Sequence, residues 1–177
     1  MEDLPWTSEE QKERLLLIGS VCAQWSHLEH LFSGTIWTLL KLDDETGKIV
    51  TGGLDMLRRA RMAINLARHL KASRSLIKAL LAARDAIQNK LDEKRNRVVH
   101  GFQILSLDAK QLQIEVHRGK GDRKKHELTA AELYKLNDDI HDVSATLLIV
   151  LRRTIWTNWR AKHGASHEIY LKRTGQA

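Results

Sequence analysis

The chain has 177 residues, of which 42% are hydrophobic and 29% charged, and Cys22 is its one cysteine. These values are typical of a globular domain and exclude collagen-like, disordered and disulfide-stabilised chains. The N-terminus lacks the apolar core of a signal peptide, and no apolar run approaches the roughly 18 residues that a membrane helix needs. We therefore expect one soluble, cytoplasmic domain over residues 1–177, without a membrane segment.

The net charge favours an anionic partner. Basic residues outnumber acidic ones by 29 to 22, which gives a formal charge of +7. A charge of this sign suits a polyanion such as nucleic acid. Net charge alone does not separate a nucleic-acid-binding protein from an ordinary basic one, so specific residues have to decide.

A polar segment separates the first two predicted helices. A capping box at residues 7–10 and apolar residues at three- and four-residue steps predict a helix that ends near Lys41. Residues 43–53 are polar and punctuated by glycine, so we expect an irregular connection there. Apolar residues from Leu54 onward predict a second helix that ends near Lys71.

The third predicted helix is followed by the one strand-rich part of the sequence. Ser73 can cap this helix, and Gly101 can terminate it. Apolar and polar residues then alternate on both sides of a turn at residues 108–111. We expect a β-hairpin or a three-stranded meander, inserted at about residues 101–127.

The last predicted helix completes a bundle. A second capping box at residues 129–132 opens a helix with near-heptad apolar spacing, which we expect to end near Lys162, before a basic tail from about residue 163. The predicted fold is mainly α, an antiparallel bundle of about four helices with the hairpin between helices 3 and 4. The whole chain forms a single helical domain in this interpretation.

The end of the third predicted helix carries residues suited to cutting RNA. A histidine with a near-neutral pKa can take the proton from a ribose 2′-hydroxyl, and an arginine can hold the phosphate through paired hydrogen bonds. His100 and Arg95 are our candidates for these two roles. Asn96 lies four residues before His100, on the same helix face, where its amide can orient the imidazole or a phosphate oxygen. This chemistry needs no metal and no other cofactor.

Arg95 and His100 do not share a face of a regular helix. Five residues correspond to a rotation of about 140° around the helix axis. A joint site therefore requires either that the last turn loosens before Gly101 or that a second subunit approaches.

A helical bundle with Arg95, the polar Asn96 and His100 at a helix end resembles the HEPN superfamily, which carries an Arg-x4-6-His motif. The resemblance implies a metal-independent endoribonuclease that acts on RNA as a homodimer. Motifs of both subunits would line one cleft, and cleavage would leave a 2′,3′-cyclic phosphate. The resemblance also implies a role as a toxin or in phage defence, with an antitoxin or another partner protein. Other members of the family have lost activity and bind nucleotides or partners.

Three other interpretations stay open. The cations can stabilise a helix C-terminus, with Asn96 and His100 capping carbonyl groups. The chain can be an inactive HEPN-like module for dimerisation, nucleotide binding or partner binding. It can also be a helical interaction protein whose partner docks on tryptophans and on the basic tail. Spacing alone does not decide, because residues 160–167 also run from arginine to histidine, with Ala161 in the polar position and Gly164 expected to interrupt a helix.

Further basic residues are weaker candidates for substrate binding. Lys94 and Arg97 flank the motif, and a second group lies near the end of the insert: Arg118, Lys120, Arg123, Lys124 and Lys125. This second group can follow a phosphate backbone, although we favour a solvated loop. For the aromatic residues of the tail we favour a core or dimer surface over base stacking: these are Trp156, Trp159 and Tyr170.

We expect no metal site. His27 with His30, and His163 with His167, have spacings that a metal can use, but neither pair has a clear third ligand. Glu29 interrupts an apolar region, and it faces either solvent, which we favour, or a polar cleft in the bundle.

Overall fold

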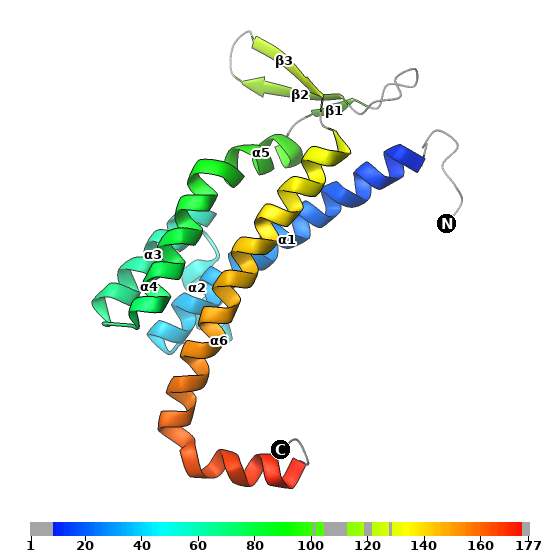
Figure 1. The fold of residues 1–177 in the computed structure, drawn as a ribbon. Coiled ribbons are helices and arrows are strands. Elements are labelled where there is room, and N and C mark those ends of the chain that lie inside the picture. The colour runs from blue at the N-terminus through cyan, green and yellow to red at the C-terminus, as the bar shows by residue number, and fades with distance from the viewer. Residues whose placement is uncertain (1–8, 101, 105–112, 119–121, 128, 175–177) are drawn as a thin grey trace.

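The computed structural model of the chain describes residues 9–100, 102–104, 113–118, 122–127 and 129–174, with side chains at 9, 12–99 and 129–154. The fold is mainly helical, as predicted (Figure 1). The helices are α1 (Glu9–Leu40), α2 (Asp44–Thr51), α3 (Met56–His69), α4 (Arg74–Ala86), the π-helical turn η1 (Ile87–Leu91), α5 (Asp92–His100) and α6 (Ala130–Thr174). No helix in the part searched has the length and apolar character to cross a membrane.

Side-chain caps explain where four of these helices begin. In each case the side chain of the cap accepts a hydrogen bond from the backbone N–H three residues later; the caps are Asp43, Asp55, Ser73 and Thr129. At Thr129 the bond is reciprocated, because the Glu132 carboxylate accepts from the Thr129 backbone N–H at 3.0 Å. This is the capping box predicted from the sequence.

The connection predicted at residues 43–53 is wrong, because most of it folds as α2. The Trp37 ring of α1 packs directly against Gly47 of this helix, and a Cβ atom at position 47 would come within 2.6 Å of the ring. The Trp37 indole N–H also donates to the Thr51 hydroxyl at 3.1 Å. Contacts with α1 therefore hold a polar, glycine-containing segment in helical form.

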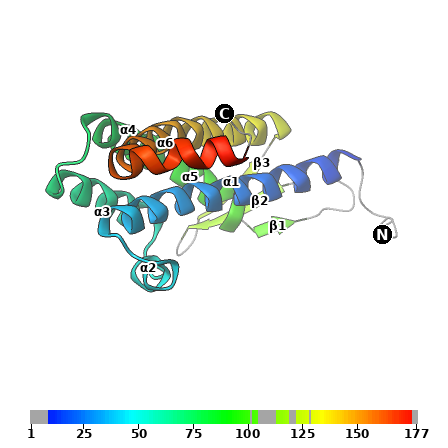
Figure 2. The ribbon, with the colours of Figure 1, turned by 90° about the horizontal axis from the view of Figure 1, so that it is seen from below.

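Four helices pack around the core as a ring, in which α1 contacts α3 and α6, and α4 contacts the same two helices (Figures 1 and 2). The antiparallel arrangement predicted for the bundle is wrong for α1 and α6. Tyr134 donates to Glu13, and Asn137 to the Leu17 carbonyl, so the two helices advance in the same direction.

The reason for this direction lies in the return of the chain after α1. Arg59, in the first turn of α3, forms an ion pair with Glu29 near the middle of α1. The segment between the two helices therefore returns from the end of α1 at Leu40 to the middle of α1 before α3 begins. This extra reversal gives α6 the direction of α1.

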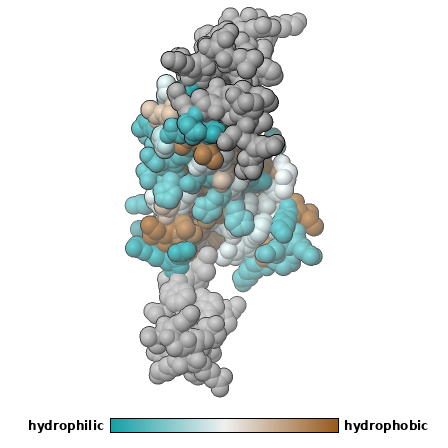
Figure 3. All heavy atoms as spheres, turned by 90° about the vertical axis from the view of Figure 1, so that its right-hand side faces the viewer, coloured by the Kyte–Doolittle hydropathy of each residue, from teal (hydrophilic) through white to brown (hydrophobic). Residues whose placement is uncertain are grey.

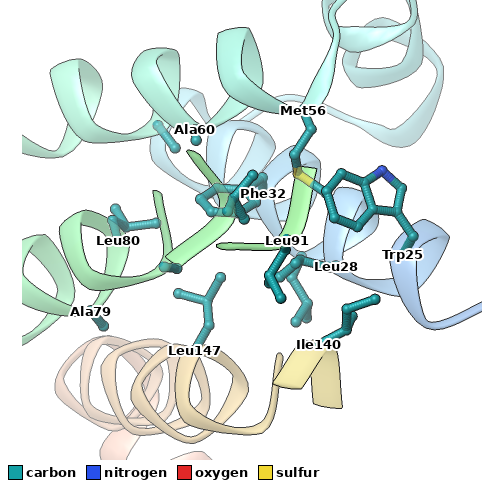
Figure 4. Close-up of a cluster of buried hydrophobic side chains, with 14 of the residues drawn as sticks. Trp25, Leu28, Phe32, Met56, Ala60, Ala79, Leu80, Leu91, Ile140 and Leu147 are labelled. Carbon is teal, nitrogen blue, oxygen red and sulfur yellow. The ribbon is translucent and has the colours of Figure 1, made fainter. Parts of the chain in front are cut away.

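The core fills the space between these four helices. Phe32 and Leu28 of α1, Leu80 of α4 and Ile140 of α6 are fully buried there (Figure 4). Small residues line the facing surfaces of two of the helices: Ala60, Ala63 and Ala67 of α3, and Ala79 and Ala83 of α4. Alanines let the helix axes approach closely, so the core is densely packed.

The third predicted helix is continuous from Arg74 to His100, but η1 interrupts its α-helical regularity. The Asp92 backbone N–H bonds to the Ile87 carbonyl, five residues back. In an uninterrupted α-helix, Arg95 would lie about 120° around the helix axis from the buried Ala83. A π-helical turn accommodates one extra residue, so it reduces this angle by about 100°. The turn thus brings Arg95 close to the buried side of the helix.

A small antiparallel sheet follows α5, with strands β1 (Phe102–Ile104), β2 (Gln113–Arg118) and β3 (Asp122–Glu127) in the order β1-β2-β3. Phe102 pairs with Glu115, and Arg118 pairs with Asp122. β2 contacts α5, so the sheet lies at the end of the bundle where the Arg95 helix terminates (Figure 1). The turn predicted at 108–111 lies outside the described residues.

α6 continues well past its predicted end near Lys162 and reaches Thr174, so the expected tail from residue 163 is helical. Gly164, expected to interrupt a helix, lies within α6. The last part of α6 turns away from the bundle (Figure 1). Figure 3 shows the face of the molecule that lies on the right in Figure 1. The described residues on this face are mostly hydrophilic, and its hydrophobic residues lie in separate patches.

Candidate functional site

A pocket of about 400 Å³ opens between α1, the start of α3 and α5. Its walls carry guanidinium groups, carboxylates and an indole; the lining residues are Trp25, Glu29, Asp55, Met56, Leu57, Arg58, Arg61, Asp92, Arg95 and Asn96. Two of the three predicted catalytic residues, Arg95 and Asn96, thus lie in one concave site. Its volume falls at the lower end of the range for small-ligand sites, roughly 300–1,000 Å³.

Contacts with Trp25 and Asn96 orient the Arg95 side chain. Its guanidinium carbon lies 5.2 Å from the centre of the Trp25 ring, a cation–π arrangement. Its Nη1 donates to the Asn96 Oδ1 at 2.9 Å. Trp25 is buried and packs beside Met56 (Figure 4), so the indole is a rigid support for the cation.

Glu29 forms the wall of the pocket on the α1 side. Its Oε1 accepts from the Trp25 indole N–H at 3.2 Å, and its Oε2 lies 3.0 Å from the Arg59 Nη1. Arg59 also donates to the Thr51 carbonyl at 3.2 Å. Of the two interpretations of Glu29, the structure supports the polar cleft, where the carboxylate joins α1 to α3.

The pocket charges are partly paired with one another. Arg58 forms an ion pair with Asp55 at 3.2 Å, and Arg59, just behind the lining, neutralises Glu29. Arg61 is exposed, and no hydrogen bond or ion pair joins its guanidinium to another described side chain. With Arg59 counted, the site has four arginines, Arg58, Arg59, Arg61 and Arg95, and three acids, Glu29, Asp55 and Asp92.

His100 ends α5, and its side chain lies outside the described residues. The backbone between positions 95 and 100 is regular α-helix, because α5 runs from Asp92 to His100. The π-helical turn η1 ends before Arg95, so it does not alter the angle between these two positions. These positions remain about 140° apart around the helix. Asn96, four residues before His100, is the position that shares a face with it.

Of the weaker substrate-binding candidates, the two with described side chains, Lys94 and Arg97, do not line the pocket. Lys94 is exposed and lies outside the lining, and Arg97 forms an ion pair with Glu93 at 2.7 Å. In the insert, Arg118 belongs to β2 and three further candidates to β3: Arg123, Lys124 and Lys125. The side chains of all four, and Lys120 entirely, lie outside the described residues, as do the side chains of Trp156, Trp159 and Tyr170.

The α3 wall of the pocket was missed in the sequence. Arg58, Arg59 and Arg61 crowd the first turns of α3, which has no acidic residue in its first turn. Cations near a helix N-terminus oppose the positive end of the helix dipole. Such a run is unfavourable without acids or a bound anion nearby, and this signal could have marked the segment as part of a site.

Among the described residues, histidine and cysteine side chains do not gather elsewhere. His27 and His30 are exposed on α1, and the His30 ring meets the Trp37 ring edge-on at 5.9 Å. Cys22 is half-buried and forms no disulfide. Within the part of the chain searched, no three potential metal ligands of the His, Cys, Asp or Glu type lie together. The His163 and His167 side chains lie outside the described residues.

The chain was compared with protein-family models, with curated proteins and with solved structures. None of the three comparisons found a match. The functional argument therefore depends on the geometry of the pocket and on the motif.

Proposed function

We propose that the chain is a metal-independent endoribonuclease of the HEPN type, acting as a homodimer in a toxin or defence role in the cytoplasm. The observation that carries the proposal is the placement of Arg95 and Asn96, joined by a hydrogen bond, in one pocket. An arginine whose plane is held by an indole is oriented in advance for the oxygens of a phosphate.

The roles follow from the chemistry of RNA cleavage. His100 removes the proton from a ribose 2′-hydroxyl, and the 2′-oxygen attacks the adjacent phosphorus. Arg95 stabilises the negative charge that grows on the phosphoryl oxygens. The bond from phosphorus to the 5′-oxygen breaks, and that oxygen takes a proton from the imidazolium or from water. The products are a 2′,3′-cyclic phosphate and a 5′-hydroxyl, and Asn96 orients Arg95 throughout.

The helix geometry makes this a dimeric mechanism. Because positions 95 and 100 lie about 140° apart on one helix, Arg95 of one subunit would act with His100 of the other. We expect a homodimer at micromolar concentration in sedimentation, and a strictly monomeric protein would contradict the composite site.

RNA cleavage in EDTA tests the proposal. Arg95→Ala and His100→Ala should each lower the cleavage rate by about 10²-fold or more. Lys78→Ala is the matched control, because Lys78 is an exposed cation of α4 outside the pocket and is not a candidate for substrate binding. Products of the active protein should end in a cyclic phosphate. Equal cleavage by all variants would place the activity elsewhere or in a contaminant.

A second candidate is an inactive HEPN-like module that binds a nucleotide or a partner protein. The contacts of Arg95 with Trp25 and Asn96 support it, because they give the arginine a structural role without catalysis. A well-folded dimer that binds RNA or nucleotide but leaves no cyclic phosphate would favour this candidate over the nuclease.

A further inference from the structure

We propose that the pocket is a phosphate-binding subsite for single-stranded RNA, in which Arg61 provides the second phosphate contact beside Arg95. The proposal rests on the proposed function for the identity of the ligand as RNA, while the contact itself can be tested without cleavage. It assigns a binding role to a helix, α3, that the Arg95 to His100 motif does not include.

Arg61 differs from its neighbour Arg59 in the way its charge is used. Arg59 is 14% exposed and holds Glu29 and the Thr51 carbonyl, so its guanidinium joins helices. Arg61 is exposed, lines the pocket and makes no hydrogen bond or ion pair with a described residue. An arginine on a pocket wall without such a structural contact is suited to bind an external anion.

The charge balance of the pocket favours an anion. The lining and the adjacent Arg59 together carry four arginines against three acids, and two of these acids, Glu29 and Asp55, already form ion pairs with Arg59 and Arg58. The result is one excess positive charge in a concave site. Concave walls of low dielectric concentrate the field of such a charge.

The size of the pocket limits the kind of anion. A volume of about 400 Å³ suits one nucleotide unit and is too small to enclose a duplex or a folded partner element. One nucleotide of single-stranded RNA, with its phosphodiester, meets this limit. A free mononucleotide shares the same phosphate chemistry, so the experiment has to separate the two.

The test measures binding of a fluorescent single-stranded oligonucleotide in which every 2′-hydroxyl is methylated. This probe cannot undergo attack by the 2′-oxygen, so its affinity is independent of catalysis. Arg61→Ala should weaken binding about tenfold, the usual effect of losing one charged hydrogen-bonding contact. The slope of log affinity against log salt should fall by about 0.7, the value for one phosphate of a single strand.

Arg68→Ala is the matched control, because Arg68 is an exposed arginine in the last turn of the same helix and does not line the pocket. It should leave the affinity within about twofold, since it removes the same charge outside the site. Equal losses in both variants would overturn the proposal in favour of general attraction by net charge. An unchanged affinity of Arg61→Ala would also overturn it.

Two outcomes separate this inference from the proposed function. If the protein binds the probe through Arg61 but never cleaves unmodified RNA, the subsite stands and the nuclease fails. If it cleaves RNA and Arg61→Ala changes neither binding nor rate, the nuclease stands and the subsite fails. Binding of a mononucleotide through Arg61, without binding of the oligonucleotide, would overturn the assignment to RNA.

Discussion

The same helices build two contrasting regions. In one, Phe32 of α1, Ala60 of α3 and Leu80 of α4 are buried in one cluster of apolar side chains (Figure 4). In the other, near Trp25, helices α1, α3 and α5 meet through Glu29, Arg59 and Arg95, and a pocket remains open.

The difference shows how a bundle separates stability from binding. Small and branched apolar side chains let helices close against each other, so the first region excludes water and ligands alike. Long charged side chains with fixed partners keep the second region open and place cations on its walls. Predictions that alter one region and spare the other measure this separation.

The largest expected effect comes from the apolar region. Phe32→Ala should lower the free energy of unfolding by about 3–5 kcal/mol, because a fully buried ring is lost and a cavity remains. Urea unfolding of the purified protein measures this change. Leu16→Ala is the control, since Leu16 is 75% exposed and should change stability by less than about 0.5 kcal/mol. A loss below about 1 kcal/mol in Phe32→Ala would contradict the packing described.

An intermediate effect is expected where the two regions adjoin. Glu29→Gln removes the charge that faces Arg59, and it should cost about 1–3 kcal/mol, because Arg59 is only 14% exposed. Glu93→Gln breaks the more exposed pair with Arg97 and should cost less than about 1 kcal/mol. Similar unfolding midpoints for the two variants would show that the Glu29 pair has no special role.

A small effect is expected in the pocket itself. Asp92→Asn neutralises the third acid of the lining, beside the paired Glu29 and Asp55. The change should strengthen binding of the methylated oligonucleotide about twofold, as expected for two charges roughly 8 Å apart in water. Asp138→Asn alters an exposed acid of α6 outside the pocket and should leave the affinity unchanged. A gain of equal size in both variants would point to net charge instead of the pocket.

The smallest effect lies outside both regions, at the start of α2. The hydrogen bond from the Thr46 backbone N–H, followed by that from its hydroxyl, lowers the pKa of Asp43 below its ordinary value of 3.8. The stabilisation is therefore complete above that ordinary value and is lost as the pH falls through the lower pKa of the folded state. An NMR titration of the Asp43 carboxyl should show this pKa, and Asp43→Asn should keep the cap without the pH dependence.

Local signals in the sequence were sufficient for the main helices. Ser73 and Thr129 were expected as caps and act as caps, because capping depends on residues three positions apart. The α2 helix was missed because Gly47 fits it only through contact with Trp37, and a tertiary contact of this kind leaves no local pattern. The direction of α6 was missed for the same reason, since it depends on the return of the chain after α1.

The candidate site was anticipated on one side only. Arg95 and Asn96 stood out by their spacing to His100, and the structure places both in the pocket. Arg61 and Asp55 are distant in sequence and become neighbours of α5 only through the packing of α3. For Glu29 the sequence favours a solvent-facing position over the polar cleft, because one sequence does not show which residue will provide the opposite charge.

The π-turn at Ile87–Leu91 makes the pocket depend on the number of residues in a helix as well as on their identity. Deleting one residue from this turn would restore a regular α-helix and preserve every side chain of the motif. The helix beyond it would nevertheless rotate by about 100° and carry Arg95 away from Trp25. A single-codon deletion would thus remove the site while keeping every residue of the motif.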